Sequence, residues 1–517
     1  MLNGFTQRLE QLYERSEDFL GRSWPVWVAA ILFYVASSWI LLTKVRFPEP
    51  LYFIVFVMAV AIIALTVFRI EWALLGLCAM IAFTRPGVSL GVDDAFHISG
   101  FNVALLGVWF VYMVRYASDR AFAAKGPLVR TTALDRVVFV YLLLVTLAMV
   151  VGLTKNTGGF ALGRILLYWK EQVLYFAWFY LVVTFLREPR DLRRFATTFA
   201  LAGLLVAAIG LFQRFGGAVE AVTATEDQLE AGVIGGRSEG TSFLGLGHPN
   251  FLGAFLIMSL PTWFFMVDHL KKWYQRILAD AGILLGLLAL LFTYSRSAWI
   301  GVVGGIGLLG LSDRRALRRI FVFLILFAIV SQGLSLAYSG RGVVELISLR
   351  FEQLNRSNYS ARPAIFRSAL DLIAAHPFIG VGPSAFPWHA DNSMVGGRYL
   401  SQGHNLLLTL AAENGIPATI AYVLLLGMIL RMALHNLRRL ARYKGYGFIA
   451  QGTYAGLLAI LTQTLFVHLF YHRNVGYALY ALLAIIVSLD RMVREGQFGP
   501  EAAGALTAPD STWKGES

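Results

Sequence analysis

The feature that most constrains this chain is a succession of fourteen apolar runs separated by polar or charged segments. A helix needs roughly 20 apolar residues to cross the hydrocarbon core of a bilayer, and most of these runs approach that length. The shortest runs could instead be re-entrant segments. The runs cover 26–43, 51–68, 71–84, 101–114, 137–153, 172–186, 195–212, 250–267, 279–294, 298–311, 320–336, 406–430, 449–470 and 475–489.

The composition agrees with this interpretation. Hydrophobic residues make up 57% of the 517 residues and charged residues only 15%, which is more apolar surface than a soluble domain can bury. We therefore predict an all-α, polytopic integral membrane protein with about 12–14 transmembrane helices and a long exterior loop that contains helices. Cys78 is the single cysteine, which excludes a disulfide within the chain and a cysteine-based metal site.

The basic residues predict how the chain is oriented in the membrane. With both termini in the cytoplasm, the cytoplasmic segments carry 28 of the 44 lysines and arginines, and the exterior segments carry 16. Six of those sixteen lie in one long loop, where the positive-inside rule has least force. The basic residues lie in short loops between apolar runs, as expected for orientation in a membrane, so the net charge of +13 does not indicate nucleic-acid binding.

The division of the chain into segments follows from these runs. Two exterior segments are too long to be simple connections, and long loops in compact proteins are usually functional. The expected segments are an amphipathic interfacial helix (1–23), N-terminal transmembrane helices (24–212), an exterior loop (213–249), central transmembrane helices (250–336), a large exterior loop that carries catalytic residues (337–405), C-terminal transmembrane helices (406–490) and a disordered cytoplasmic tail (491–517).

Arg296 lies in "FTYSRSAWIG", a turn of a few residues between two apolar runs on the exterior side. One interpretation is an arginine that extends toward the membrane surface. Against it, an exterior arginine opposes the charge asymmetry, and its neighbours Ser295 and Ser297 are polar. No carboxylate is near in the sequence, so an anionic ligand would supply the partner that a buried guanidinium requires.

Arg362 belongs to a predicted helix that begins near Ser360 and ends at His376. It lies four residues before Phe366 and seven before Ala369, so it shares their apolar face. An arginine in such a place is expected to bind a carboxylate or phosphate in bidentate contact. The turn that follows, "GVGPSAF", either presents backbone N–H groups to an anion or simply ends the helix.

His404 begins the segment "HNLLLTLAAENG" at the end of the large exterior loop. A histidine at a helix start is most often a cap or a packing residue. His404, however, closes the loop that carries Arg362 and lies on the same predicted membrane face as Arg296. The ordinary pKa of histidine, about 6.5, suits proton abstraction near neutrality. Either Asn405 or Glu413 could orient its ring.

Other kinds of chemistry are not indicated. The exterior segments contain no DxD or HExxH metal motif, and Asp93, Asp94 and His97 form only a weak metal candidate. The sequence has neither a P-loop nor a dinucleotide-binding fingerprint. We therefore expect chemistry that uses no metal, no nucleotide and no other cofactor.

Four short segments, taken in order, resemble the bacterial O-antigen ligase and O-antigen polymerase (Wzy-type) superfamily of lipid-linked glycan enzymes. The resemblance covers roughly residues 195–490, while the preceding part contributes only hydrophobicity. The segments are "GGRSEGTSFLGLGHPNFLGAFL" (235–256), "TYSRSAWIG" (293–301), "ARPAIFRSALDLIAAHPFIGVGPSAF" (361–386) and "GHNLLLTLAAENGIP" (403–417).

The resemblance implies a metal-independent, inverting glycosyltransferase of the bacterial inner membrane, with its site on the periplasmic side. Its donor would be a glycan on undecaprenyl pyrophosphate, its acceptor a glycan or a lipid, and its surroundings membrane lipid. A chain-length regulator protein is a further candidate partner. By carry-over, His404 would be the general base, and Arg296 and Arg362 would bind the pyrophosphate. Further candidates for substrate contact are Arg237, Arg164, Lys170 and Asn405.

Three functions stay open on the sequence alone. Ligases of this superfamily are expected to carry Gly, Thr or Tyr three residues after the glycine at position 415, whereas Ala418 stands there, which favours a polymerase. A ligase that transfers polymer to lipid A-core or to protein is the alternative. A membrane transporter or flippase belongs to another class, but the predicted spans contain few charges and no repeat, which transporters tend to show.

Overall fold

The computed structural model describes most of the chain in several stretches. They are residues 50–83, 87–90, 96–118, 126–155, 159–215, 249–293, 295–310, 314–339, 342, 344–345, 348, 361–389, 394–395, 398–399, 405–441, 443, 445–468 and 472–498. The predicted interfacial helix 1–23, the predicted run 26–43, most of loop 213–249 and the tail beyond residue 498 lie outside the described residues.

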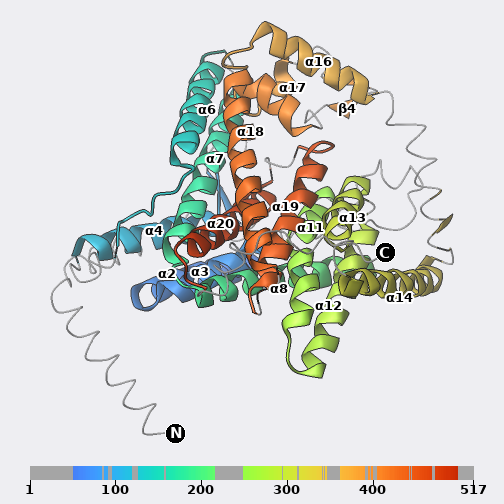
Figure 1. Ribbon diagram of the computed structural model, residues 1–517. Coiled ribbons are helices and arrows are strands. Elements are labelled where there is room, and N and C mark those ends of the chain that lie inside the picture. Colours follow the sequence, from blue (N-terminus) through green and yellow to red (C-terminus); the bar gives the residue numbers. More distant parts are fainter. Residues whose placement is uncertain are drawn as a thin grey trace, which may run out of the picture.

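The other predicted apolar runs all coincide with helices (Figure 1). The first half of the chain forms α2 (Pro50–Phe68), α3 (Ile70–Met80), η1 (Ile81–Phe83), α4 (Gly100–Ser118), α6 (Asp135–Lys155), α7 (Gly159–Phe185) and α8 (Pro189–Phe215). The central part forms α11 (Pro249–Met266), η3 (Val267–His269), α12 (Trp273–Phe292), α13 (Arg296–Gly310) and α14 (Arg314–Ser339). The last part forms α16 (Ala361–Ala375), α17 (Phe386–His389), α18 (Leu406–Leu440), α19 (Gly447–Thr464) and α20 (Arg473–Arg494).

Two short antiparallel hairpins accompany the helices in the described part of the chain. In the first, β1 (Gly87–Leu90) pairs with β2 (Phe96–Ser99), which leads directly into α4. In the second, β3 (Met394–Val395) pairs with β4 (Arg398–Tyr399).

Seven of the described helices are long and apolar enough to cross a membrane. The shorter apolar helices Val55–Phe68 and Ile70–Met80 add to them. The predicted fold class, an all-α polytopic membrane protein, is therefore confirmed. The seven are Gly100–Ser118, Asp135–Lys155, Pro189–Phe212, Asn250–His269, Trp273–Phe292, Leu406–Leu440 and Arg473–Arg494.

The core of the bundle is built around α11 and α20, in each of which 94% of the most apolar window is buried. Helix α11 packs against α8, α13 and α19, and α20 packs against α7 and α18. Glycines allow close backbone approach at these contacts: a Cβ atom on Gly456 of α19 would lie 2.7 Å from the carbonyl oxygen of Met258 in α11. In membranes the hydrophobic effect does not drive helices together, and small residues at helix contacts instead allow the close van der Waals packing that stabilises them.

Helix α18 is interrupted in its first third. Gly415 has φ 83° and ψ 165°, a conformation that side chains disfavour, so α18 consists of two helices placed end to end. Pro417 lies in the first turn of the second part, where its missing N–H is tolerated. Figure 1 shows α16 and α17 beside the first part of α18, at the end of the molecule toward which α6 and α7 project.

Candidate active site

Two helices that begin at or beside sequence-predicted site residues, α13 and α18, start near the C-terminal end of α19. Helix α13 runs antiparallel to α19, because Gly301 abuts Ala459 and Gly305 abuts Ala455. Continuing this register places the first turn of α13, which begins at Arg296, level with the last turn of α19. Arg296 lies five residues before Gly301, so its side chain leaves α13 about 140° away from the face that contacts α19. The hydroxyls that flank Arg296 are buried, with Ser295 Oγ 3.4 Å from Ser297 Oγ.

Asn405 is tied to the same end of α19. Its Oδ1 accepts a hydrogen bond of 3.0 Å from the backbone N–H of Leu408, which makes Asn405 the N-cap of α18. Its Nδ2 donates a bond of 2.9 Å to the carbonyl oxygen of Leu465, the C-cap residue of α19. Capping of α18 is thus performed by Asn405. The preceding residue, His404, lies outside the described residues.

The first turn of α11 adjoins both of these elements. Gln463 of α19 donates a hydrogen bond of 3.0 Å from Nε2 to the carbonyl oxygen of Asn250. A Cβ atom on Gly253 would lie 2.9 Å from the Cβ of Ala298 in α13. The first turns of α11, α13 and α18 therefore gather around the last turn of α19. The candidate Arg237, which precedes α11, lies outside the described residues.

The turn "HPFIGVGPSAF" is docked into the interruption of α18. Glycines make the approach possible, since a Cβ on Gly380 would overlap the backbone of Glu413. Phe386 N–H also donates to Glu413 Oε1 at 3.3 Å, so the buried carboxylate holds this turn. Three backbone hydrogen bonds complete the joint: Val381 N to Ala412 O at 3.1 Å, Gly382 N to Glu413 O at 2.9 Å, and Ile416 N to Pro377 O at 2.8 Å.

Helix α16 carries Arg362 in its first turn, where the structure describes the backbone but not this side chain. Ile365 and Ala369 of α16 are buried in a small cluster with Phe386 of the turn and Ala412 of α18. The helix ends at Ala375, one residue before the predicted end at His376. Helix α16, the glycine turn and the first part of α18 therefore form one packed unit, which brings the Arg362 backbone into the same unit as Asn405.

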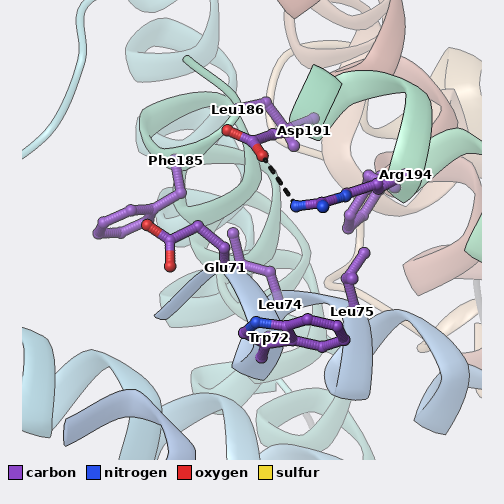
Figure 2. Close-up of a pocket in the computed structure, with 9 residues that line it drawn as sticks. Glu71, Trp72, Leu74, Leu75, Phe185, Leu186, Asp191 and Arg194 are labelled. Carbon is purple, nitrogen blue, oxygen red and sulfur yellow. Dashed lines mark ion pairs between the residues drawn. The ribbon is translucent and has the colours of Figure 1, made fainter. Parts of the chain in front are cut away.

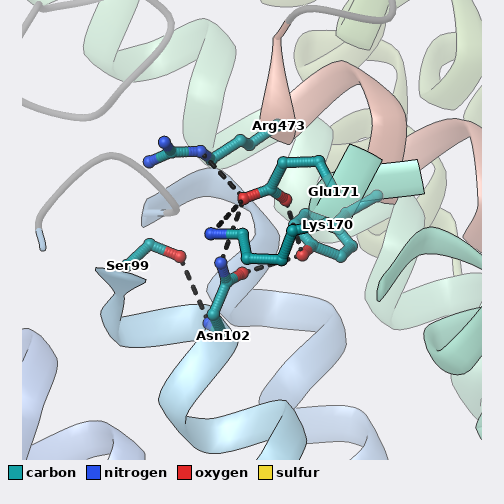
Figure 3. A network of polar contacts seen from close by, with 6 residues as sticks. Ser99, Asn102, Lys170, Glu171 and Arg473 are labelled. Carbon is teal, nitrogen blue, oxygen red and sulfur yellow. Dashed lines mark hydrogen bonds and ion pairs between the residues drawn. The ribbon is translucent and has the colours of Figure 1, made fainter. Parts of the chain in front are cut away.

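A buried polar cluster joins α4, α7 and α20 (Figure 3). Its centre is Glu171, whose side chain is only 2% exposed. Glu171 Oε1 lies 3.1 Å from Lys170 Nζ, 3.1 Å from Arg473 Nε and 3.1 Å from Asn102 Nδ2. Tyr477 OH contacts both Glu171 Oε2, at 3.0 Å, and Asn102 Oδ1, at 2.7 Å. Of these residues only Lys170 was predicted from the sequence; adjacent opposite charges in an apolar run were the available signal for Glu171.

This polar cluster borders the first turn of α11. The ring of His472, which precedes Arg473, is stacked on the ring of Phe251 in α11. Arg164 lies seven residues before Glu171 on α7, hence on the same face of that helix. Its guanidinium carbon is 5.9 Å from the centre of the Tyr168 ring. The candidates Arg164 and Lys170 thus both lie on α7, Lys170 in direct contact with Glu171 and Arg164 two turns before it.

A cavity between α3, the end of α7 and the start of α8 lies elsewhere (Figure 2). Arg194 faces Asp191 there at 3.9 Å, and Glu71 and Trp72 line the opposite wall. Its lining residue Phe185 is about 21 Å along α7 from Glu171, at 1.5 Å per residue. None of the predicted site residues whose side chains the structure describes lines this cavity.

The fold and this arrangement define a class of protein: a polytopic α-helical membrane protein with polar and basic side chains gathered at one end of the bundle. The O-antigen ligase family model matches residues 281–423, from α12 into the second part of α18. The match includes Arg296, Arg362 and His404, and it confirms the resemblance to the O-antigen ligase and polymerase superfamily over that segment. An enzyme of the ligase or polymerase type is supported in general. None of the curated proteins compared with the chain matches it.

Proposed function

We propose that the protein is a metal-independent, inverting glycosyltransferase that polymerises undecaprenyl-pyrophosphate-linked oligosaccharide repeats. The observation that carries the proposal is that the first turn of α13, which begins at Arg296, and the first turn of α18, which Asn405 caps beside His404, both lie at the last turn of α19. The family match over residues 281–423 supports the same assignment. The protein would lie in the inner membrane with cytoplasmic termini and a periplasmic site.

In this mechanism His404 accepts the proton of an acceptor hydroxyl. The hydroxyl oxygen attacks the anomeric carbon of the donor glycan, and the bond from that carbon to the pyrophosphate oxygen breaks with inversion. The electron pair leaves with undecaprenyl pyrophosphate, whose growing charge Arg296 and Arg362 would stabilise. Losing one such contact costs on the order of 3 kcal/mol of barrier, or about a hundredfold in rate.

Polymerase is preferred to ligase because of the residue at position 418. Ala418 replaces the Gly, Thr or Tyr expected of ligases there, and it is buried behind the interruption of α18. Transfer of polymer to lipid A-core or to protein is the second candidate, since the matched family model is that of the O-antigen ligases. A chain-length regulator protein would be a partner of the polymerase.

Product analysis separates these functions. Purified protein in detergent is mixed with an undecaprenyl-pyrophosphate-linked glycan, with and without a candidate lipid acceptor, and products are resolved by size. A ladder of longer lipid-linked glycans without acceptor supports the polymerase. Transfer only when acceptor is present supports the ligase. Substrate that stays unchanged in both mixtures, although the protein still binds the lipid, contradicts polymerase and ligase alike. That result favours a transporter or flippase, whose function cannot be observed in detergent.

A further inference from the structure

Arg473 presents an unused hydrogen-bonding edge next to the candidate active site. Its Nε contacts Glu171 Oε1 at 3.1 Å. Its two terminal nitrogens have no partner among the described residues, and Figure 3 shows them pointing away from the polar cluster. The side chain is nevertheless only 16% exposed. A largely buried guanidinium with a free fork is the usual receptor for a carboxylate or phosphate.

The carboxylate of Glu171 is already fully engaged. One of its oxygens is shared by Lys170, Arg473 and Asn102, and the other accepts from Tyr477. The Glu171 carboxylate therefore holds Nε of Arg473 in place, and its other contacts prevent it from rotating toward the two terminal nitrogens of that arginine. A guanidinium held in this way is preorganised, so less side-chain entropy is lost when an anion binds.

Helix α11 separates this arginine from Arg296. Phe251 of α11 faces His472 at the start of α20, whereas Gly253 faces the first turn of α13. Residues two apart on a helix point about 200° apart, so the two contacts lie on opposite sides of α11. A helix with its side chains is about 10–12 Å wide. Arg473 and Arg296 therefore belong to two separate basic positions across the first turn of α11.

The proposed reaction has two lipid-linked substrates, each with its own pyrophosphate. The donor loses its pyrophosphate in the transfer, while the acceptor repeat keeps its own. Binding both at once requires two anion-binding positions, and like charges must be kept apart. Two positions on opposite sides of one helix meet both requirements.

We propose that Arg473, with Lys170 beside it, binds the pyrophosphate of the second lipid-linked substrate, the acceptor. This inference rests on the proposed polymerase function, but its central test does not depend on turnover. The ligand class is a lipid pyrophosphate, and the phosphate of an ordinary phospholipid is the competing source of the same chemistry.

The test is the number of undecaprenyl pyrophosphate molecules that bind to the full-length protein in detergent, counted by native mass spectrometry. The wild-type protein should bind two equivalents. Arg473→Gln should weaken one equivalent by about tenfold or more, the loss expected for a charge-assisted hydrogen bond, and leave the other unchanged. Arg473→Lys, which keeps the charge, should restore part of the affinity.

Arg494→Gln is the matched control, because Arg494 lies at the other end of α20 and pairs with Asp490 at 2.7 Å. It should bind two equivalents like the wild type. Should Arg473→Gln fail to fold, Lys170→Gln is measured instead, since it leaves the contact between Glu171 and Arg473 in place, and one weakened equivalent is again expected.

Three outcomes would overturn the proposal. The wild type could bind a single equivalent, the Arg473 and Lys170 variants could bind two with unchanged affinity, or excess phosphatidylglycerol could displace the second equivalent. If the protein binds two equivalents but shows no glycan transfer, only the proposed function is contradicted.

Discussion

Gly415 and Phe378 are packed backbone against backbone: a Cβ atom on Gly415 would overlap the carbonyl oxygen of Phe378 and lie 2.7 Å from the nitrogen of Ile379. The segments 361–386 and 403–417, each of which resembles the family, are thus packed against one another; this contact is called the joint below. Gly415, which follows His404 at a fixed spacing, interrupts α18. The turn after α16 packs against this interruption. The positions of the Arg362 and His404 segments therefore depend on the same contact.

Gly415→Ala should consequently destabilise the protein by at least about 2 kcal/mol, because it adds a clash to a backbone conformation that alanine disfavours. Gly427→Ala is the control, since Gly427 is in the same helix and a Cβ atom there would have no neighbouring atom within 4 Å. That change should be neutral or stabilising by up to about 1 kcal/mol. Thermal unfolding in detergent compares them, and equal midpoints would refute the joint.

The local features of this region were predictable from sequence, whereas the joint was not. The end of α16 before His376 and the burial of Ala369 follow from short-range periodicity and turn residues. The contact of Gly415 with Phe378 depends on tertiary packing, and a single sequence indicates only that a glycine is present.

The polar cluster around Glu171 shows the same limit. Lys170 stood out because it is charged in an apolar region. The partners of Glu171, however, come from positions 69 residues earlier, at Asn102, and 306 residues later, at Tyr477. No periodicity connects such positions. Arg473 was equally unremarkable in the sequence, since a basic residue at the end of a short connection is usual in membrane proteins.

The predicted orientation can be tested by cysteine labelling. In a Cys78→Ala background, Val343→Cys should react with a membrane-impermeant maleimide added from the periplasmic side, because the 28 to 16 distribution of basic residues places loop 337–405 outside. A cysteine introduced in the connection between η3 and α12, at Lys271, should react only from the cytoplasmic side. Labelling of residue 343 only from inside would overturn the topology and the periplasmic site with it.

Activity should persist without divalent metal. The exterior sequence lacks metal motifs, and no group of three or more potential metal ligands occurs among the described residues. Charge on the leaving pyrophosphate would instead be balanced by arginines. Glycan transfer is therefore measured after EDTA treatment and dialysis, with and without added Mg²⁺ or Mn²⁺. Loss of transfer that Mg²⁺ restores would contradict the two-arginine mechanism.

Acidic pH should weaken the contact between α6 and the glycine turn. Lys155 Nζ lies 3.4 Å from His376 Nδ1, and burial together with the Lys155 charge lowers the pKa of His376 below its ordinary 6.5. The unfolded chain then holds more protons than the folded one, so stability falls as the pH drops below about 6.5 and levels off below the folded pKa. His376→Gln should flatten this part of a stability-against-pH curve in detergent. An unchanged slope would exclude His376 as its source.

The roles assigned to the site residues predict different kinetic losses. His404→Ala should abolish turnover while leaving the fold and the affinity for lipid-linked donor intact, because it touches the acceptor proton and not the pyrophosphate. Arg296→Ala and Arg362→Ala should weaken donor binding as well as rate. Even Arg362→Lys should be poor, since a lysine cannot form a bidentate fork.

Asn405→Ala separates this chemistry from helix capping. Asn405 caps α18 and holds Leu465, so its loss should reduce stability by roughly 1 kcal/mol. The rate of glycan transfer should then fall only to the extent that loss of the cap displaces the start of α18. The deciding measurement is glycan transfer by folded His404→Ala protein beside its affinity for undecaprenyl-pyrophosphate-linked glycan, with Asn405→Ala run in parallel. If His404→Ala retains substantial transfer, His404 is a packing residue and the proton must be taken by another group.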